Sequence, residues 1–227
     1  MIPLKDDNPR TGWPVVNFML IGLNVLVFMY QLSLPGELAE RFAYTFGAVP
    51  SRLMQGEAFY TLLTSMFLHG GFMHILFNML YLYIFGDNVE NSMGSLRYLS
   101  FYILCGLVAA FSHLVTNPAS TVPMVGASGA ISGVMGAYAV TYPRARVLVL
   151  VPIFFFITTI RVPALFLLMF WFITQLSSGL ASLGVQVGGG IAWFAHIGGF
   201  VAGAILVKLF QKKRRWVESI EPPGPYY

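Results

Sequence analysis

The distribution of charged residues constrains this chain more than any other feature of its sequence. Of its 227 residues, 57% are hydrophobic and only 10% are charged, whereas a soluble domain carries about 25% charged residues. Four stretches contain no charged residue at all, namely 11–36, 58–86, 98–143 and 162–207. Because a helix needs about 20 apolar residues to cross the hydrocarbon core of a bilayer, we expect an integral membrane protein.

The lengths of these stretches set the expected number of helices. The first two each have room for one membrane span, and the last two each have room for two. Turn-like sequences divide the long stretches at Asn117–Pro123 and at Gly184–Gly190. We therefore predict an all-α polytopic membrane fold of six helices, at 14–32, 62–85, 96–116, 126–142, 162–182 and 191–210.

One apolar segment, Val147–Ile160, is too short to span a bilayer and contains Pro152. It is expected to lie at the membrane interface as the connection between the fourth and fifth helices.

Basic residues predict the orientation of the helices. They form three groups: Lys5 and Arg10; Arg144, Arg146 and Arg161; and Lys208, Lys212, Lys213, Arg214 and Arg215. Six spans place all three groups on one side, which the positive-inside rule makes cytoplasmic. The net charge of +4 comes from these flanks and does not indicate a nucleic-acid partner. We expect a cytoplasmic segment 1–13, a membrane domain 14–210, and a basic, then proline-rich cytoplasmic tail 211–227.

Two polar residues are expected at the same depth in the membrane. Ser128 follows the first turn-like segment closely and His196 follows the second, so both helices enter from the extracytoplasmic side. Polar groups at membrane depth are costly and are functional candidates for that reason. A serine hydroxyl becomes an effective nucleophile when a base removes its proton, and histidine is suited to that role. The pair therefore indicates a nucleophile and its general base.

Glycines accompany both residues. Gly129 and Gly133 follow Ser128, while Gly199 and Gly203 follow His196. Small residues at four-residue spacing let membrane helices approach backbone to backbone. If the two stripes face each other, the hydroxyl and the imidazole come within hydrogen-bonding reach, and Gly126 leaves room for a substrate backbone. Helix packing alone is the alternative interpretation of these glycines.

The second predicted helix carries further polar residues, His69, His74 and Asn78. His74 and Asn78 are four residues apart and share one helix face. Their side chains are suitable donors to a developing oxyanion, as is the backbone N–H of Ser128 near a helix start. Hydrogen bonding between helices is the alternative. No carboxylate lies in the predicted spans, so a catalytic dyad is expected, and too few ligands are present to predict a metal or a cofactor.

Three motifs together resemble those of the rhomboid intramembrane serine proteases. They are His69-x4-His74-x3-Asn78, Gly126-x-Ser128-Gly129 and Gly190-x4-Ala195-His196-x2-Gly199-x3-Gly203. The resemblance covers roughly residues 14–208. It implies a bacterial six-helix core in which a short central helix carries the serine. It also implies that Ser128 is the nucleophile, that His196 is its base, and that His74, Asn78 and the Ser128 N–H bind the oxyanion.

The resemblance implies a function as well as a fold. We expect an intramembrane serine endopeptidase that cleaves peptide bonds in or near transmembrane helices of membrane-protein substrates. Its partners would be those substrates and the lipid bilayer of a bacterial inner membrane, with the site open to the extracytoplasmic side. A catalytically silent rhomboid-like binder of membrane clients is the alternative, whereas a channel or carrier would need ionisable residues along a full pathway.

One departure from the family concerns the long loop Ser33–Phe59. Rhomboids commonly carry a Trp-Arg pair shortly before the second helix, and here Tyr60 and Thr61 stand at that place. The contacts that usually stabilise the loop must therefore come from other residues.

Overall fold

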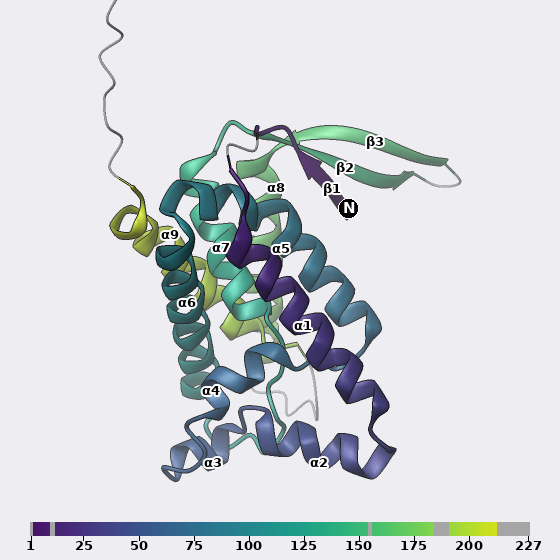
Figure 1. The fold of residues 1–227 in the computed structure, drawn as a ribbon, viewed down its shortest axis with the longest axis vertical. Helices are drawn as coiled ribbons and strands as arrows, with labels where there is room; N and C mark the ends of the chain where they lie inside the picture. The colour runs from purple at the N-terminus through teal and green to yellow at the C-terminus, as the bar shows by residue number, and fades with distance from the viewer. Residues whose placement is uncertain (1, 10–11, 154–155, 184–190, 213–227) are drawn as a thin grey trace, which may run out of the picture.

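A computed structural model describes residues 2–9, 12–153, 156–183 and 191–212 (Figure 1). Most of these residues are helical. A bundle of helices forms the body of the molecule, a small antiparallel sheet lies at one end, and two short helices lie at the other (Figure 1). Arg10, the predicted turn at 184–190 and the part of the predicted tail from residue 213 onward lie outside the described residues.

Helices occur at all six predicted positions, but not all of them are shown to span a membrane. Within the described ranges, the helices long and apolar enough to do so are α1 (Val15–Ser33), α6 (Ser95–Thr116), α8 (Ala164–Ser182) and α9 (Trp193–Phe210). A fifth candidate joins α4 (Thr61–Thr64) and the 3-10 helix η1 (Ser65–Phe67) to α5 (Phe72–Met93) through a bend of 93°. The helix that begins at the serine, α7 (Ser128–Thr141), has only 14 residues.

The expected all-α class requires a correction. The segment predicted as an interfacial connection forms a hairpin of β2 (Arg146–Ile153) and β3 (Phe156–Pro163), in which Arg146 pairs with Pro163. β1 (Ile2–Asp6) adds an antiparallel strand on the other side of β2. Alternate residues Val147 and Val149 of β2 are buried, which is the period of a strand. Its β-branched residues favour that conformation.

Burial explains the uniformly apolar sequence of α7. Every residue from Gly129 to Ala139 is buried, and α7 packs against α5, α6, α8 and α9. A helix that is apolar all round is one that is enclosed on all sides. The most extensive of these contacts is with α9.

Glycines bring α7 and α9 together. A Cβ added to Gly203 would overlap the backbone of Gly133, and one added to Gly199 would overlap the carbonyl of Gly129. These four glycines are among the five predicted to lie near the site, the fifth being Gly126. Backbone contact at two levels of the same interface fixes both the distance and the register between the helices.

Substitution of Gly203 by alanine should therefore destabilise the protein. Because the new methyl group meets the backbone of Gly133, the helices must separate, and overpacking of this kind costs about 1–3 kcal/mol. Gly22→Ala is the matched control, since a Cβ on Gly22 in α1 would have no atom within 4 Å. Thermal unfolding in detergent should show a lower midpoint for Gly203→Ala only; equal midpoints would contradict the proposed contact.

The sheet contacts the far end of α7 through Asp6. The Tyr138 hydroxyl and the Asn88 side-chain amide both donate hydrogen bonds to Asp6 Oδ2. Burial raises the pKa of Asp6 to about 6, and the neighbouring carboxylates of Asp87 and Asp7 add to the rise, while the hydrogen bond from Tyr138 opposes it.

This raised pKa predicts a pH-dependent stability. Between the ordinary Asp pKa of 3.8 and about 6, the folded state binds a proton that the unfolded state has lost. Stability should therefore fall as pH rises through that window and level off above it. Thermal unfolding midpoints from pH 4 to pH 8 should show a smaller decline in Asp6→Asn than in the wild type. The same decline in both proteins would show that Asp6 is not responsible.

Candidate active site

Ser128 and His196 meet at one end of the bundle. Ser128 is the first residue of α7, and His196 lies in the first turn of α9. The Oγ atom of Ser128 is 2.8 Å from Nε2 of His196. Ser128 directly precedes Gly129, and His196 lies three residues before Gly199, so the contact between these two glycines fixes the relative position of the two side chains.

The segment before Ser128 is shaped by a glycine. Gly126 has a φ of 125°, a conformation that side chains disfavour, and its N–H donates to the Ser65 carbonyl at 2.9 Å. The chain turns into α7 directly afterwards. As the first residue of that helix, Ser128 has a backbone N–H with no acceptor within the helix.

The second ring nitrogen of His196 has a partner that sequence reasoning missed. Nδ1 lies 2.8 Å from Oε1 of Gln175, a buried residue of α8. The rings of Trp171 and Trp193 also contact the imidazole, with centroid distances of 5.8 and 6.4 Å. An uncharged polar residue in an otherwise apolar span was the available signal for Gln175, by the same reasoning that singled out Ser128.

His74 and Asn78 of α5 approach the segment before Ser128. The N–H of Gly70 donates to Nδ1 of His74 at 3.3 Å, so in the neutral ring Nε2 carries the proton. A Cβ on Gly126 would lie 2.8 Å from Nε2 of His74 and 3.7 Å from Nδ2 of Asn78. That amide nitrogen is buried and has no hydrogen-bond partner among the described residues. Two donors thus converge beside Gly126.

His69 has a different position. Its ring packs edge-on against the ring of His74, with centroids 5.1 Å apart. Its backbone exchanges two hydrogen bonds with the side chain of Gln31 in α1. His69 therefore packs against His74 and is itself held by α1.

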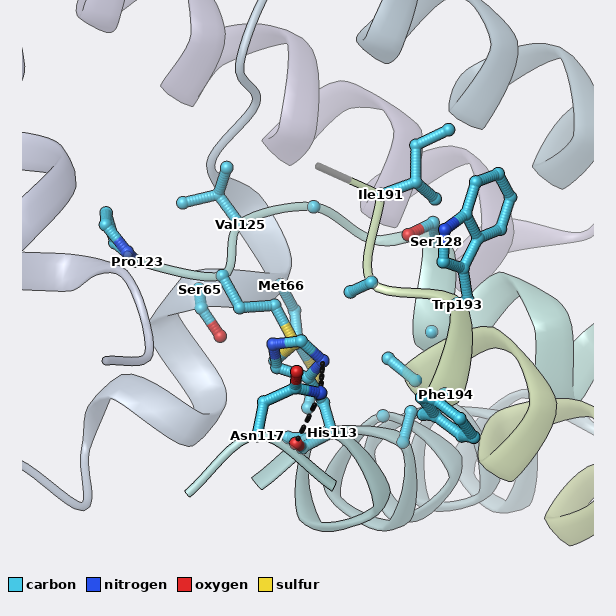
Figure 2. Close-up of a pocket in the computed structure, with 18 of the residues that line it drawn as sticks. Ser65, Met66, His113, Asn117, Pro123, Val125, Ser128, Ile191, Trp193 and Phe194 are labelled. Carbon is cyan, nitrogen blue, oxygen red and sulfur yellow. Dashed lines mark hydrogen bonds between the residues drawn. The ribbon is translucent and has the colours of Figure 1, made fainter. Parts of the chain in front are cut away.

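A cavity of about 580 Å³ reaches Ser128, His74 and Gly126. In Figure 2, Ser128 lies beside Trp193. His113 of α6 and Asn117, which follows the end of that helix, lie apart from them and are joined by hydrogen bonds. Sequence reasoning missed this second polar pair, although a histidine and an asparagine at four-residue spacing in an apolar stretch were visible. The described residues contain no group of three or more His, Cys, Asp or Glu that could hold a metal ion.

The long first loop is held by side-chain hydroxyls. It contains α2 (Gly36–Phe46) and α3 (Pro50–Met54). The hydroxyl of Tyr60 donates to the Thr45 carbonyl at 2.9 Å, and that of Thr64 donates to the Phe46 carbonyl at 2.7 Å. Thr61 instead bonds the nearby Ala58 carbonyl. The end of α2 is thereby tied to α4 without the Trp-Arg pair that rhomboids commonly carry.

The same loop is joined to the segment that leads into α7. Ala48 and Met124 exchange two backbone hydrogen bonds, of 3.0 and 2.8 Å. Ser51 N–H donates to the Ser120 carbonyl at 3.0 Å. The first loop therefore forms a fixed part of the cavity's surroundings.

Comparison with known proteins confirms the resemblance found in the sequence. The family model of the rhomboid domain matches residues 56–213. The chain is 34% identical over 128 residues to the rhomboid protease GluP of Bacillus subtilis, a match that covers 56% of this chain and 25% of that protein. It is 30% identical over 141 residues to the rhomboid protease AarA of Providencia stuartii, covering 56% and 50%.

A plant relative extends the match. RHOMBOID-like protein 6, mitochondrial, of Arabidopsis thaliana is 30% identical over 172 residues, covering 74% of this chain and 49% of that protein. The chain thus spans between a quarter and about half the length of these three relatives. The match of the family model to more than half of the chain, together with its apolar helices, shows an integral membrane protein that belongs to the rhomboid family, whose characterised members are intramembrane serine proteases.

Proposed function

We propose that this protein is an intramembrane serine endopeptidase that cleaves peptide bonds in or near the transmembrane helices of membrane-protein substrates. The observation that carries the proposal is the 2.8 Å contact between Ser128 Oγ and His196 Nε2 at a cavity. A nucleophile paired with a base, beside convergent donors and a space for substrate, is the arrangement that acyl transfer requires. Family membership supports the same reaction.

The proposal includes six crossings and a defined orientation. α7, at the fourth predicted position, is added to the five candidate spans. A helix that is enclosed by its neighbours does not need to match the bilayer thickness itself. Lys5, Arg144, Arg146 and Arg161 all belong to or adjoin the sheet, and the positive-inside rule supports a cytoplasmic location for that end. The cavity then opens on the extracytoplasmic side of a bacterial inner membrane, with both termini cytoplasmic and the domain limits as predicted, 1–13, 14–210 and 211–227.

The chemistry proceeds in two stages. Ser128 Oγ attacks the carbonyl carbon of the scissile bond while its proton passes to His196 Nε2. The oxyanion accepts hydrogen bonds from His74 Nε2, Asn78 Nδ2 and the Ser128 N–H. The imidazolium then protonates the leaving amine, which departs. A cavity water, deprotonated by His196, then attacks the carbonyl carbon of the acyl-enzyme. As the bond to Ser128 Oγ breaks, the protonated His196 gives its proton to that oxygen and the new carboxyl terminus is released.

A substrate helix must unwind locally before this can occur. Its peptide carbonyls are engaged in the helix's own hydrogen bonds, which shield the peptide bonds from attack. Helix-breaking or small residues beside the scissile bond are therefore expected to favour cleavage.

Removal of either member of the pair should abolish cleavage. Ser128→Ala and His196→Ala should each lower the rate on a labelled single-span substrate in liposomes by at least about 10³-fold, because the nucleophile or its base is lost. Ser100→Ala, an exposed serine that bonds its own helix, should leave the rate unchanged. Cleavage by Ser128→Ala at the wild-type rate would overturn the proposal. A wild-type protein that retains a client without cleaving it would favour the binder.

Loss of the Asn78 amide should reduce the rate of the chemical step. Asn78→Leu keeps the size of the side chain but removes a donor, and loss of one oxyanion donor lowers kcat by about 10²–10³-fold. Asn91 is a suitable control, because its Nδ2 is also buried without a partner among the described residues, but at the sheet end of α5. Kinetics should show a fall in kcat for Asn78→Leu and none for Asn91→Leu. A rise in KM with unchanged kcat would contradict the assigned role.

A further inference from the structure

We propose that Gln175 is a positioning residue which, with Thr174, fixes the protonation of His196 so that its Nε2 can only accept the Ser128 proton. The inference rests on the proposed function and adds to it a part of α8 that neither the sequence motifs nor the dyad includes. Its basis is a continuous series of hydrogen bonds from the carbonyl of Trp171 to the hydroxyl of Ser128.

The series begins at a carbonyl, which can only accept. Thr174 Oγ1 lies 2.6 Å from the backbone oxygen of Trp171 and donates its single proton to it. The same hydroxyl oxygen lies 3.3 Å from the side-chain amide of Gln175. Since Thr174 has no further proton to give, it must accept from Gln175. The NH₂ group of Gln175 therefore faces Thr174, and this conclusion comes from counting protons.

The orientation of the amide then decides the state of the imidazole. With its NH₂ group turned to Thr174, Gln175 presents Oε1 to His196, 2.8 Å from Nδ1. An amide oxygen only accepts, so Nδ1 must carry a proton. A neutral imidazole has one ring proton, which leaves a lone pair on Nε2. Nε2 is 2.8 Å from Ser128 Oγ. Because Nε2 has no proton, the serine hydroxyl must be the donor in that hydrogen bond.

The alternative tautomer would be inactive. It would place a proton on Nε2, facing Ser128, where no base would then be available. An imidazole without a partner at Nδ1 would divide its population between the two forms, and only one of them can take the serine proton. Catalytic histidines generally depend on such a partner for tautomer and ring orientation.

α8 fixes the orientation of the His196 ring as well as the position of its proton. Gln175 is only 7% exposed, and Trp171, one helical turn earlier, contributes the indole that packs on the imidazole. The carbonyl of Trp171 is also the start of the hydrogen-bond series. One turn of α8 thus defines the direction of His196 by packing and its tautomer by hydrogen bonding.

Activity measurements test the role of this turn. Gln175→Leu removes the acceptor and should lower kcat by about 10- to 100-fold with little change in KM, the usual cost of losing a partner that orients a functional histidine. Thr174→Val removes the constraint on the amide and should give a smaller fall, of at least about 3-fold on the same basis. Thr174→Ser keeps the hydroxyl and should restore the wild-type rate. Ser177→Ala, an exposed position of α8, is the control.

A spectroscopic measurement separates positioning from a merely structural role. The ¹⁵N shifts of labelled histidine, assigned to His196 by comparison with His196→Gln, should show a proton on Nδ1 in the wild type. Ser128→Ala should keep that tautomer, because it is set from α8 and not by the serine. Gln175→Leu and Thr174→Val should show a mixture.

The possible outcomes distinguish this inference from the proposed function. A wild-type His196 protonated on Nε2, an unchanged tautomer in Gln175→Leu, or an effect on KM alone would overturn the role of Gln175, whatever the protein cleaves. Cleavage that survives Ser128→Ala would instead overturn the dyad mechanism, and the ¹⁵N shifts would still decide which tautomer α8 imposes.

Discussion

The contact between the backbones of α7 and α9 is the constraint on which the site depends. At Gly129 with Gly199, and at Gly133 with Gly203, no space remains for a Cβ. Helices separated by ordinary side chains lie about 8–10 Å apart. The glycines replace that separation by backbone contact. This contact fixes the relative position of Ser128 and His196, whose side chains form the 2.8 Å hydrogen bond.

The neighbouring helices complete the site from two sides with uncharged groups. α5 contributes donors, the ring N–H of His74 and the buried amide of Asn78, while α8 contributes the acceptor, Gln175. A carboxylate beside His196 would hold the same tautomer, but an ionised group in an apolar surrounding carries a large desolvation cost. An amide orients the imidazole without that cost, provided that its own direction is fixed. Thr174 supplies this direction through the Trp171 carbonyl.

The opposite end of α7 is fixed by a different interaction. Tyr138 donates to Asp6 of β1, which also accepts from Asn88 of α5. Together with the glycine contacts, this holds α7 along its whole length, although the helix is short. The pairing of β1 with β2 was not predicted, because it joins residues that are far apart in the sequence: β1 pairs with a strand that follows α7. No local pattern in either segment reveals its partner.

The sequence by itself determined the positions of the helices and singled out the motif residues as candidates for a site. Charge-free stretches of sufficient length must be helical in a bilayer, since each backbone polar group has to be satisfied within its own segment, and Ser128, His196, His74 and Asn78 stood out as polar residues in such stretches. Only the tertiary structure decided that Gln175 faces His196 and that β1 pairs with β2. Those contacts depend on the rotation and spacing of separate elements, which no single segment of the sequence encodes.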